Sequence, residues 1–103
     1  MGTDIQVEIP QEKLTSFCRK WRIAELALFG SVLRRDFRWD SDVDVLVTFE
    51  EGAPHSLFDF IDMQQELENL LGRKVDVVEK KGLRNPFRRS EILRTRRVIF
   101  PRP

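Results

Sequence analysis

The chain has 103 residues, the size of one ordinary domain, so we expect a single domain over residues 1–103 with one hydrophobic core. Hydrophobic residues make up 41% of it, and no run approaches the roughly 18 apolar residues of a membrane span. The N-terminus lacks the basic and then apolar pattern of a secretory signal, so we expect a soluble, cytoplasmic protein. The only cysteine, Cys18, excludes an internal disulfide and is expected in the core.

The net charge of +1 hides a steep asymmetry along the chain. Residues 80–103 carry nine Lys or Arg and one acid, whereas residues 1–79 carry nine bases and sixteen acids. We therefore expect a basic C-terminal tail on an acidic body. Such a tail can hold phosphates or an acidic partner surface, or it can be a solvated helix face that offsets the acids. Charge alone leaves both interpretations open.

The first part of the chain predicts a helix, a strand and a short helix. Pro10 suits the first position of a helix, and apolar residues recur at helical spacing from there to Trp21. The short apolar segment 25–29 stops at Gly30, which is typical of a buried strand that ends in a turn. Ser31 can cap a brief helix after that turn.

The remaining chain predicts two more strands and two more helices. Valines alternate with other residues in the next strand, an S-x-x-D capping box begins the long helix after it, and a glycine ends that helix. Residues 97–100 receive no assignment. The elements predicted here are a strand over 42–49, a helix from Ser56 to Gly72, a strand over 74–79 and a helix from Pro86 to about Arg94.

The predicted elements indicate the fold class. Strands alternate with helices, which is typical of an α/β (α+β) domain. We expect a small mixed β-sheet with helices packed chiefly on one face.

Asp42 and Asp44 are the first candidate functional residues. They stand two apart on the predicted strand, so both carboxylates project from one face. Two like charges there call for a cation, and hard oxygen ligands suit Mg²⁺. A D-x-D pattern alone is weak, because two solvated acids on an exposed strand face would give the same sequence.

Asp76 is the third candidate acid. It lies among valines in the predicted strand 74–79, where a carboxylate is unfavourable unless it has a function. If the two acid-bearing strands are neighbours, three carboxylates converge, and such a trio can hold two metal ions for phosphoryl displacement. The alternative for Asp76 is a plain acid on an edge strand.

Gly30 and Ser31 form a candidate phosphate site. Glycine lets backbone approach a ligand closely, and the free N–H groups of a helix start bind anions together with the Ser hydroxyl. Arg34 and Arg35, within the next turn, can add charge-assisted bonds to phosphate. The alternative is an ordinary turn with an N-cap.

Together these motifs resemble a known superfamily. The run from Phe29 to Val47, FGSVLRRDFRWDSDVDVLV, is similar to the signature of DNA polymerase β-like nucleotidyltransferases, a Gly-Ser turn, a short helix and then D-x-D on a strand. The short length, Arg34 and the strand around Asp76 most resemble the minimal nucleotidyltransferases that are encoded beside HEPN-domain proteins. The similarity covers essentially the whole chain from Pro10 to Phe100.

The resemblance implies a role for each candidate residue. Asp42, Asp44 and Asp76 would be the catalytic metal ligands for two Mg²⁺ ions, with Asp76 helping to activate the acceptor hydroxyl. Gly30 and Ser31 would hold the β and γ phosphates of the donor, ATP by family default, with Arg34 beside them. Minimal nucleotidyltransferases of this kind act as antitoxins that neutralise a HEPN ribonuclease, by AMP transfer to a tyrosine or by complex formation.

The chain contains no tyrosine, so an acceptor tyrosine must belong to another molecule. A HEPN toxin is therefore the expected partner, and a binding-only antitoxin without catalysis is the alternative. Nucleic-acid binding through the basic tail ranks last, because the acidic body would repel a phosphate backbone. The sequence fixes neither the acceptor nor the oligomeric state. Of the other residues considered, His55 is expected at the surface and Trp39 in packing.

Overall fold

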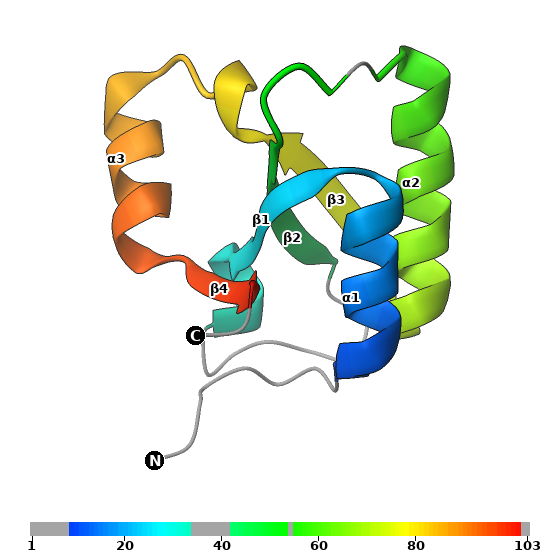
Figure 1. The fold of residues 1–103 in the computed structure, drawn as a ribbon. Coiled ribbons are helices and arrows are strands. Elements are labelled where there is room, and N and C mark those ends of the chain that lie inside the picture. Colours follow the sequence, from blue (N-terminus) through cyan, green and yellow to red (C-terminus); the bar gives the residue numbers. More distant parts are fainter. Residues whose placement is uncertain (1–8, 34–41, 54, 102–103) are drawn as a thin grey trace.

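The computed structural model describes residues 9–33, 42–53 and 55–101. Its centre is a four-stranded sheet in the order β3-β2-β1-β4, with helices on both sides (Figure 1). The elements in chain order are α1 (Gln11–Lys20), β1 (Ile23–Phe29), the 3-10 helix η1 (Gly30–Leu33), β2 (Val43–Phe49), α2 (Leu57–Leu71), β3 (Val75–Glu79), the 3-10 helix η2 (Lys80–Gly82), α3 (Pro86–Thr95) and β4 (Arg97–Phe100).

The sheet is mixed. β1 lies antiparallel to β2 and to β4, whereas β2 and β3 run parallel. Two parallel neighbours need a crossover connection, and α2 supplies it. The crossover makes β3 an edge strand beside β2.

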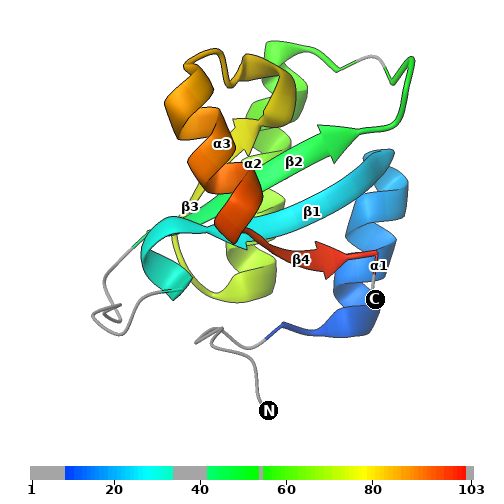
Figure 2. The ribbon, with the colours of Figure 1, turned by 90° about the vertical axis from the view of Figure 1, so that its left-hand side faces the viewer.

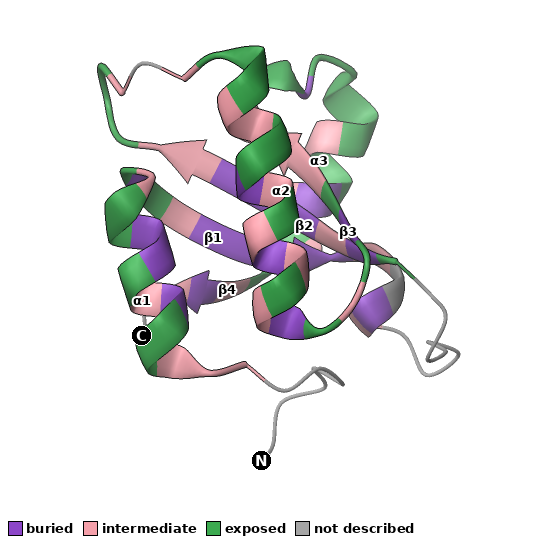
Figure 3. Ribbon diagram, turned by 90° about the vertical axis from the view of Figure 1, so that its right-hand side faces the viewer, coloured by how far each residue is buried: buried purple, intermediate pink, exposed green. Residues whose placement is uncertain are grey.

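Two of the three α-helices, α1 and α2, cover one face of the sheet, and α3 covers the other (Figures 1 and 3). The larger core cluster lies under α1 and α2, and the smaller one lies under α3. The predicted mixed sheet with helices chiefly on one face is thus confirmed. The buried members of the smaller cluster are Ala27, Phe29, Leu46, Leu83 and Ile92.

The alternation of β2 agrees with its prediction. Val43, Val45 and Val47 are fully buried in the larger cluster, and Leu46 is buried in the smaller one. Because successive strand residues point to opposite faces, Asp44 shares the α3 side with Leu46. The D-x-D motif therefore faces the side of the sheet that α3 only partly covers.

The C-terminal quarter differs from the expected basic tail. Residues 97–100, left without assignment, form β4 and pair with β1. Ile92 of α3 and Ile99 of β4 are buried in the two core clusters. This basic segment is also an integral part of the fold, because Ile92 of α3 joins the smaller cluster and Ile99 joins the larger one through the pairing of β4 with β1.

The N-terminal half agrees closely with its predicted structure. Pro10 is the N-cap of α1 rather than its first residue, and its carbonyl accepts the first helical bond, from the Leu14 N–H at 2.9 Å. Cys18 is fully buried, as predicted, and burial raises the pKa of its thiol to about 12.

His55 is not a surface residue. Its side chain is only 10% exposed, and its ring lies 4.3 Å from that of Phe49 and 6.0 Å from that of Trp21, measured between centroids. The prediction from the turn sequence was wrong because the turn folds His55 back onto Phe49, six residues before it, and brings it near Trp21 of a distant segment.

Among the helices that the structure describes, none has the length and apolar character to cross a membrane.

The predicted capping box at the start of α2 is present in full. The Asp59 N–H donates to Ser56 Oγ at 3.2 Å, and the Ser56 N–H donates to Asp59 Oδ2 at 2.9 Å. Gly72 ends the helix in the left-handed conformation, with φ +69°. Both ends of the crossover helix are therefore set by local sequence.

We expect Ser56→Ala to lower the free energy of unfolding by about 1 kcal/mol, because the Asp59 N–H loses its acceptor. Urea denaturation followed by circular dichroism would measure it. Ser90→Ala, an exposed change inside α3, is the matched control and should be neutral or slightly stabilising. Equal losses in both variants would contradict a specific role for the cap.

Candidate active site

Asp44 and Asp76 lie side by side on neighbouring strands. They are direct partners in the parallel ladder between β2 and β3, whose backbones are about 4.8 Å apart. Val43 and Val75, one residue earlier on each strand, are buried in the larger cluster, so both acids point to the α3 side. Asp44 is half-buried and Asp76 is exposed on the edge strand. The condition that the two acid-bearing strands be neighbours is met.

Asp42 lies just before β2 and is exposed. It lies two residues before Asp44, outside the strand whose alternation orients Asp44. Within residues 9–33, 42–53 and 55–101, however, no group of three or more His, Cys, Asp or Glu side chains is close enough to hold a metal ion. The structure thus brings Asp44 and Asp76 together and leaves Asp42 at the margin of the pair.

The donor chemistry of the pair fits Mg²⁺. Carboxylate oxygens are the ligands that this ion prefers, and Mg²⁺ is commonly bound through one or two carboxylates together with substrate phosphates. Asp44 and Asp76 supply two such groups at matched register.

Gly30 is in direct contact with Asp44. It follows β1 with φ +76°, a conformation that side chains disfavour, and Phe29 before it is paired with Asp44 in the sheet. A methyl group on Gly30 would overlap Oδ2 of Asp44 and lie 3.3 Å from its Cγ. The close approach of backbone to carboxylate therefore requires glycine here. The contact between Gly30 and Asp44 thus connects the Gly-Ser turn directly to the D-x-D motif.

The other predicted phosphate-binding residues are placed only in part. Ser31 lies in η1 directly after Gly30, and fully buried Val32 fixes this short helix to the core. Arg34 and Arg35 lie outside the described residues, as does Trp39.

A pocket of about 620 Å³ opens beside this contact. Gly30 and Asp44 line one side of it, and residues of α3 and β4 line the other. Figure 2 looks onto the α3 side of the molecule, with η1 at the end of β1. The lining residues are Phe29, Gly30, Leu33, Asp44, Arg88, Glu91, Ile92, Thr95 and Arg97.

The α3 wall of the pocket was missed in the sequence. Arg88, Glu91, Ile92 and Thr95 are spaced three, one and three residues apart, so they share one face of a helix. The sequence predicts this helix, but its spacing alone does not show that this face borders a pocket. On this side of the pocket Arg88 of α3 and Arg97 of β4 lie together with one acid, Glu91.

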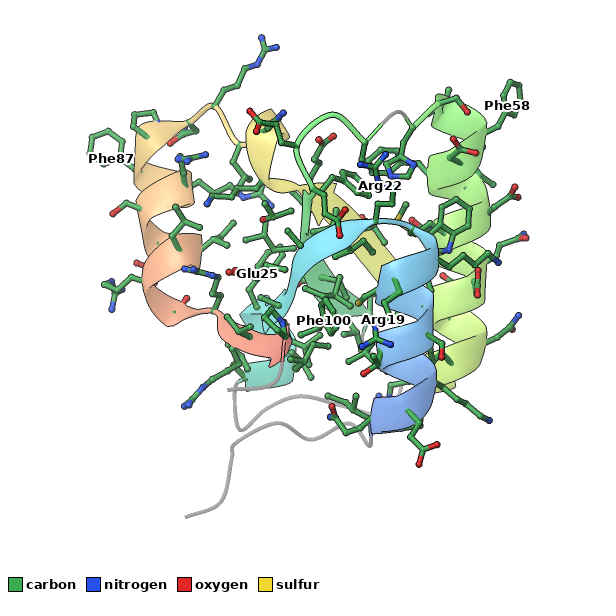
Figure 4. The ribbon with its side chains drawn as sticks, viewed as in Figure 1. Arg19, Arg22, Glu25, Phe58, Phe87 and Phe100 are labelled. Atoms are coloured by element: carbon green, nitrogen blue, oxygen red, sulfur yellow. The ribbon has the colours of Figure 1, made fainter. Side chains whose placement is uncertain are left out.

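Polar contacts fix the wall to the sheet. Arg96, between α3 and β4, donates through Nε to Glu25 of β1 at 2.8 Å and also donates to the Leu93 carbonyl. Glu25 and Arg96 are both half-buried, and Figure 4 labels Glu25 beside β1. Thr95 Oγ1 donates to the Glu91 carbonyl at 2.8 Å. The Arg96–Glu25 pair therefore links the junction before Arg97 to the sheet, and the other two bonds stabilise the last turn of α3.

Comparison with known proteins identifies the family. The nucleotidyltransferase domain model matches residues 11–99. The protein adenylyltransferase MntA of Thermococcus cleftensis is 40% identical over 81 residues, which are 79% of this chain and 77% of that one. The chain belongs to the nucleotidyltransferase domain family. The resemblance to minimal nucleotidyltransferases is thereby confirmed.

Solved structures agree with this assignment to the nucleotidyltransferase family. A structure described as a minimal nucleotidyltransferase has a TM-score of 0.69 at 40% identity, covering 84% of this chain and 86% of the other. A toxin–antitoxin crystal structure with AMP-PNP has a TM-score of 0.68 at 17% identity, covering 87% of this chain and 72% of the other. At that identity the second similarity concerns the fold alone.

We expect Gly30→Ala to abolish measurable ATP binding, because the added methyl group displaces the Asp44 carboxylate from the pocket wall. Calorimetric titration with ATP and Mg²⁺ would measure it.

Gly52→Ala is the matched control. Gly52 also has a positive φ, +80°, but nothing lies within 4 Å of an added Cβ there. Both variants should lose about 1–2 kcal/mol of stability through backbone strain, and only Gly30→Ala should lose the nucleotide. ATP binding that survives in Gly30→Ala would contradict the role given to this contact.

Proposed function

We propose that this nucleotidyltransferase moves AMP from ATP to a hydroxyl group of a partner protein, with Mg²⁺ bound at the acidic edge of the sheet. The observation that carries the proposal is the contact of Gly30 with Asp44, at a pocket beside the Asp44–Asp76 pair. The relative MntA, named as a protein adenylyltransferase, supports AMP transfer to protein.

The metal site of this proposal is the Asp44–Asp76 pair with Asp42, which lies apart from the pair in this structure, as a third ligand. Together the three carboxylates would hold two Mg²⁺ ions. Bound there, Mg²⁺ would neutralise the charge that develops on the phosphates and orient the reacting oxygens. The exposure of Asp42 and Asp76 leaves room for substrate oxygens as further ligands.

The nucleotide would occupy the pocket between Gly30 and α3. A volume of about 620 Å³ is within the range of small-molecule sites, and the two arginines of the wall suit an anionic ligand. We assign the β and γ phosphates to the backbone at Gly30 and Ser31, with Arg34 as a further phosphate ligand. The AMP-PNP of the toxin–antitoxin structure supports ATP as the donor.

Asp44 and Asp76 would have different roles because they differ in exposure. Asp44, half-buried against Gly30, faces the nucleotide side, whereas Asp76 on the open edge faces an incoming acceptor. The acceptor oxygen would bond to the α-phosphorus as the bond to the β-phosphate oxygen breaks and pyrophosphate leaves. The hydroxyl proton would pass to the Asp76 carboxylate.

The acceptor in this proposal belongs to a HEPN-type toxin, which makes the chain its antitoxin. The chain has no tyrosine of its own, and one of its fold neighbours is part of a toxin–antitoxin complex. The second candidate is a binding-only antitoxin that inhibits its partner by complex formation. The Asp44–Asp76 pair favours catalysis, because binding alone does not require two like charges side by side.

We expect transfer of label from α-labelled ATP with Mg²⁺ to one protein of a lysate from the source cells. Asp44→Asn and Asp76→Asn should each reduce the transfer by about 100-fold or more, because each removes a metal-binding carboxylate. Glu12→Gln, an exposed acid on α1, is the control and should leave transfer unchanged.

No transfer from any nucleoside triphosphate, together with tight Mg²⁺-independent capture of the toxin, would contradict catalysis and favour the binding-only antitoxin.

A further inference from the structure

The start of α2 carries an exposed apolar surface. Leu57, Phe58 and Ile61 are 75%, 76% and 51% exposed, and they lie within the first helical turns. Asp62, one turn after Phe58, and Gln65, one turn after Ile61, continue the same surface and are exposed as well. We call these five residues the α2 patch. Adjoining apolar side chains of this size are typical of an interaction site, and here they adjoin a negative charge.

The start of α3 carries a complementary surface. Phe87 is 85% exposed, the highest value among the large apolar residues that are exposed in the described part of the chain. Arg84 and Arg88, on either side of it, are exposed too. We call these three residues the α3 patch. It combines one exposed aromatic ring with two positively charged residues that are near it in the chain.

The two patches lie on opposite sides of the molecule. α2 and α3 cover opposite faces of the sheet, and Figure 4 shows Phe58 and Phe87 pointing outward on opposite sides, at the same end of the molecule. The patches of one chain therefore cannot contact each other. The α3 patch of one copy can contact the α2 patch of another.

We propose that the chain associates head to tail, with the α3 patch of one copy bound to the α2 patch of the next. Phe87 would be buried among the three apolar side chains of the α2 patch, which removes four exposed apolar side chains from water. Arg84 and Arg88 would lie near Asp62 of the other copy, and the Gln65 amide can form hydrogen bonds at the rim. A second copy of this chain is thus the occupant that the α2 patch fits.

Charge decides between this arrangement and a symmetric dimer. Two α2 patches face to face would bring Asp62 toward its own equivalent, with no positive charge in either patch to offset it. Two α3 patches would oppose Arg84 and Arg88 in the same way, because the acid one turn after Phe87, Glu91, is already paired with Arg94 at 2.7 Å. Like charges across an interface are unfavourable. Only the head-to-tail pairing joins opposite charges around an apolar centre. Because both patches remain available at the ends, such contacts close into a ring or continue as an open array.

Analytical ultracentrifugation of the purified chain tests the proposal. The unchanged chain should associate as its concentration rises, and less so at high salt, which screens the charges. Phe58→Asp and Phe87→Asp should each raise the dissociation constant about tenfold or more, because each places a carboxylate in the apolar centre. Asn69→Asp, on the exposed side of α2 but outside the patch, is the matched control and should associate normally.

A mixture of the two variants gives the decisive result. Phe58→Asp keeps an intact α3 patch and Phe87→Asp keeps an intact α2 patch, so a 1:1 mixture should form a dimer and nothing larger. A symmetric interface predicts instead that one variant dissociates and the other still dimerises alone. That outcome, or an unchanged chain that stays monomeric at every concentration, would overturn the proposal.

A charge exchange provides a second test that does not alter the aromatic residues. Asp62→Arg and Arg84→Glu should each weaken association alone. Mixing them should restore association through two contacts, one between the two unaltered patches and one between the reversed charges. Failure of the mixture to associate would count against the pairing. The ultracentrifuge reports association without nucleotide or toxin, and none of these variants changes Arg88, which also lines the nucleotide pocket. This proposal and the proposed AMP transfer can therefore fail independently.

Discussion

The contact between Gly30 and the Asp44 carboxylate is the constraint on which the site depends. It exists because β1 and β2 pair with Phe29 opposite Asp44, so the chain leaves β1 at the level of the acid. Gly30 then turns with a positive φ, and the Asp44 carboxylate occupies the space that a side chain on Gly30 would need. Val32, fully buried two residues later, holds the turn in place. A carboxylate and the backbone start of η1 are thereby brought to one pocket wall.

The other acid, Asp76, is positioned by a different part of the chain. The parallel pairing of β2 with β3 puts Asp76 beside Asp44, and that pairing requires the crossover through α2. The capping box at Ser56 and the left-handed Gly72 set where this helix begins and ends. The Glu68 carboxylate adds a direct link, since it accepts from the Val75 N–H at 3.1 Å at the start of β3. Local helix signals thus contribute to the register of the two acids.

The elements that the sequence predicted well are those with strong local signals. The valine alternation of β2, the capping box of α2 and the glycines after β1 and α2 depend on residues a few positions apart. β4 and the packing of His55 near Trp21 could not be predicted, because each depends on contacts between distant segments. The α3 wall was missed for a related reason: its spacing is helical, but only packing on the sheet shows that Glu91 and Thr95 face the same pocket as Asp44.

The central claim is that the Asp44–Asp76 edge and the Gly30 turn form one metal–nucleotide site. A crystal structure with Mn²⁺ in place of Mg²⁺ and a non-hydrolysable ATP analogue would test it most directly, because Mn²⁺ gives an anomalous signal. We expect a metal peak in contact with both Asp44 and Asp76, and a triphosphate against Gly30 and Ser31. A triphosphate bound elsewhere, or metal that contacts neither carboxylate, would contradict this site.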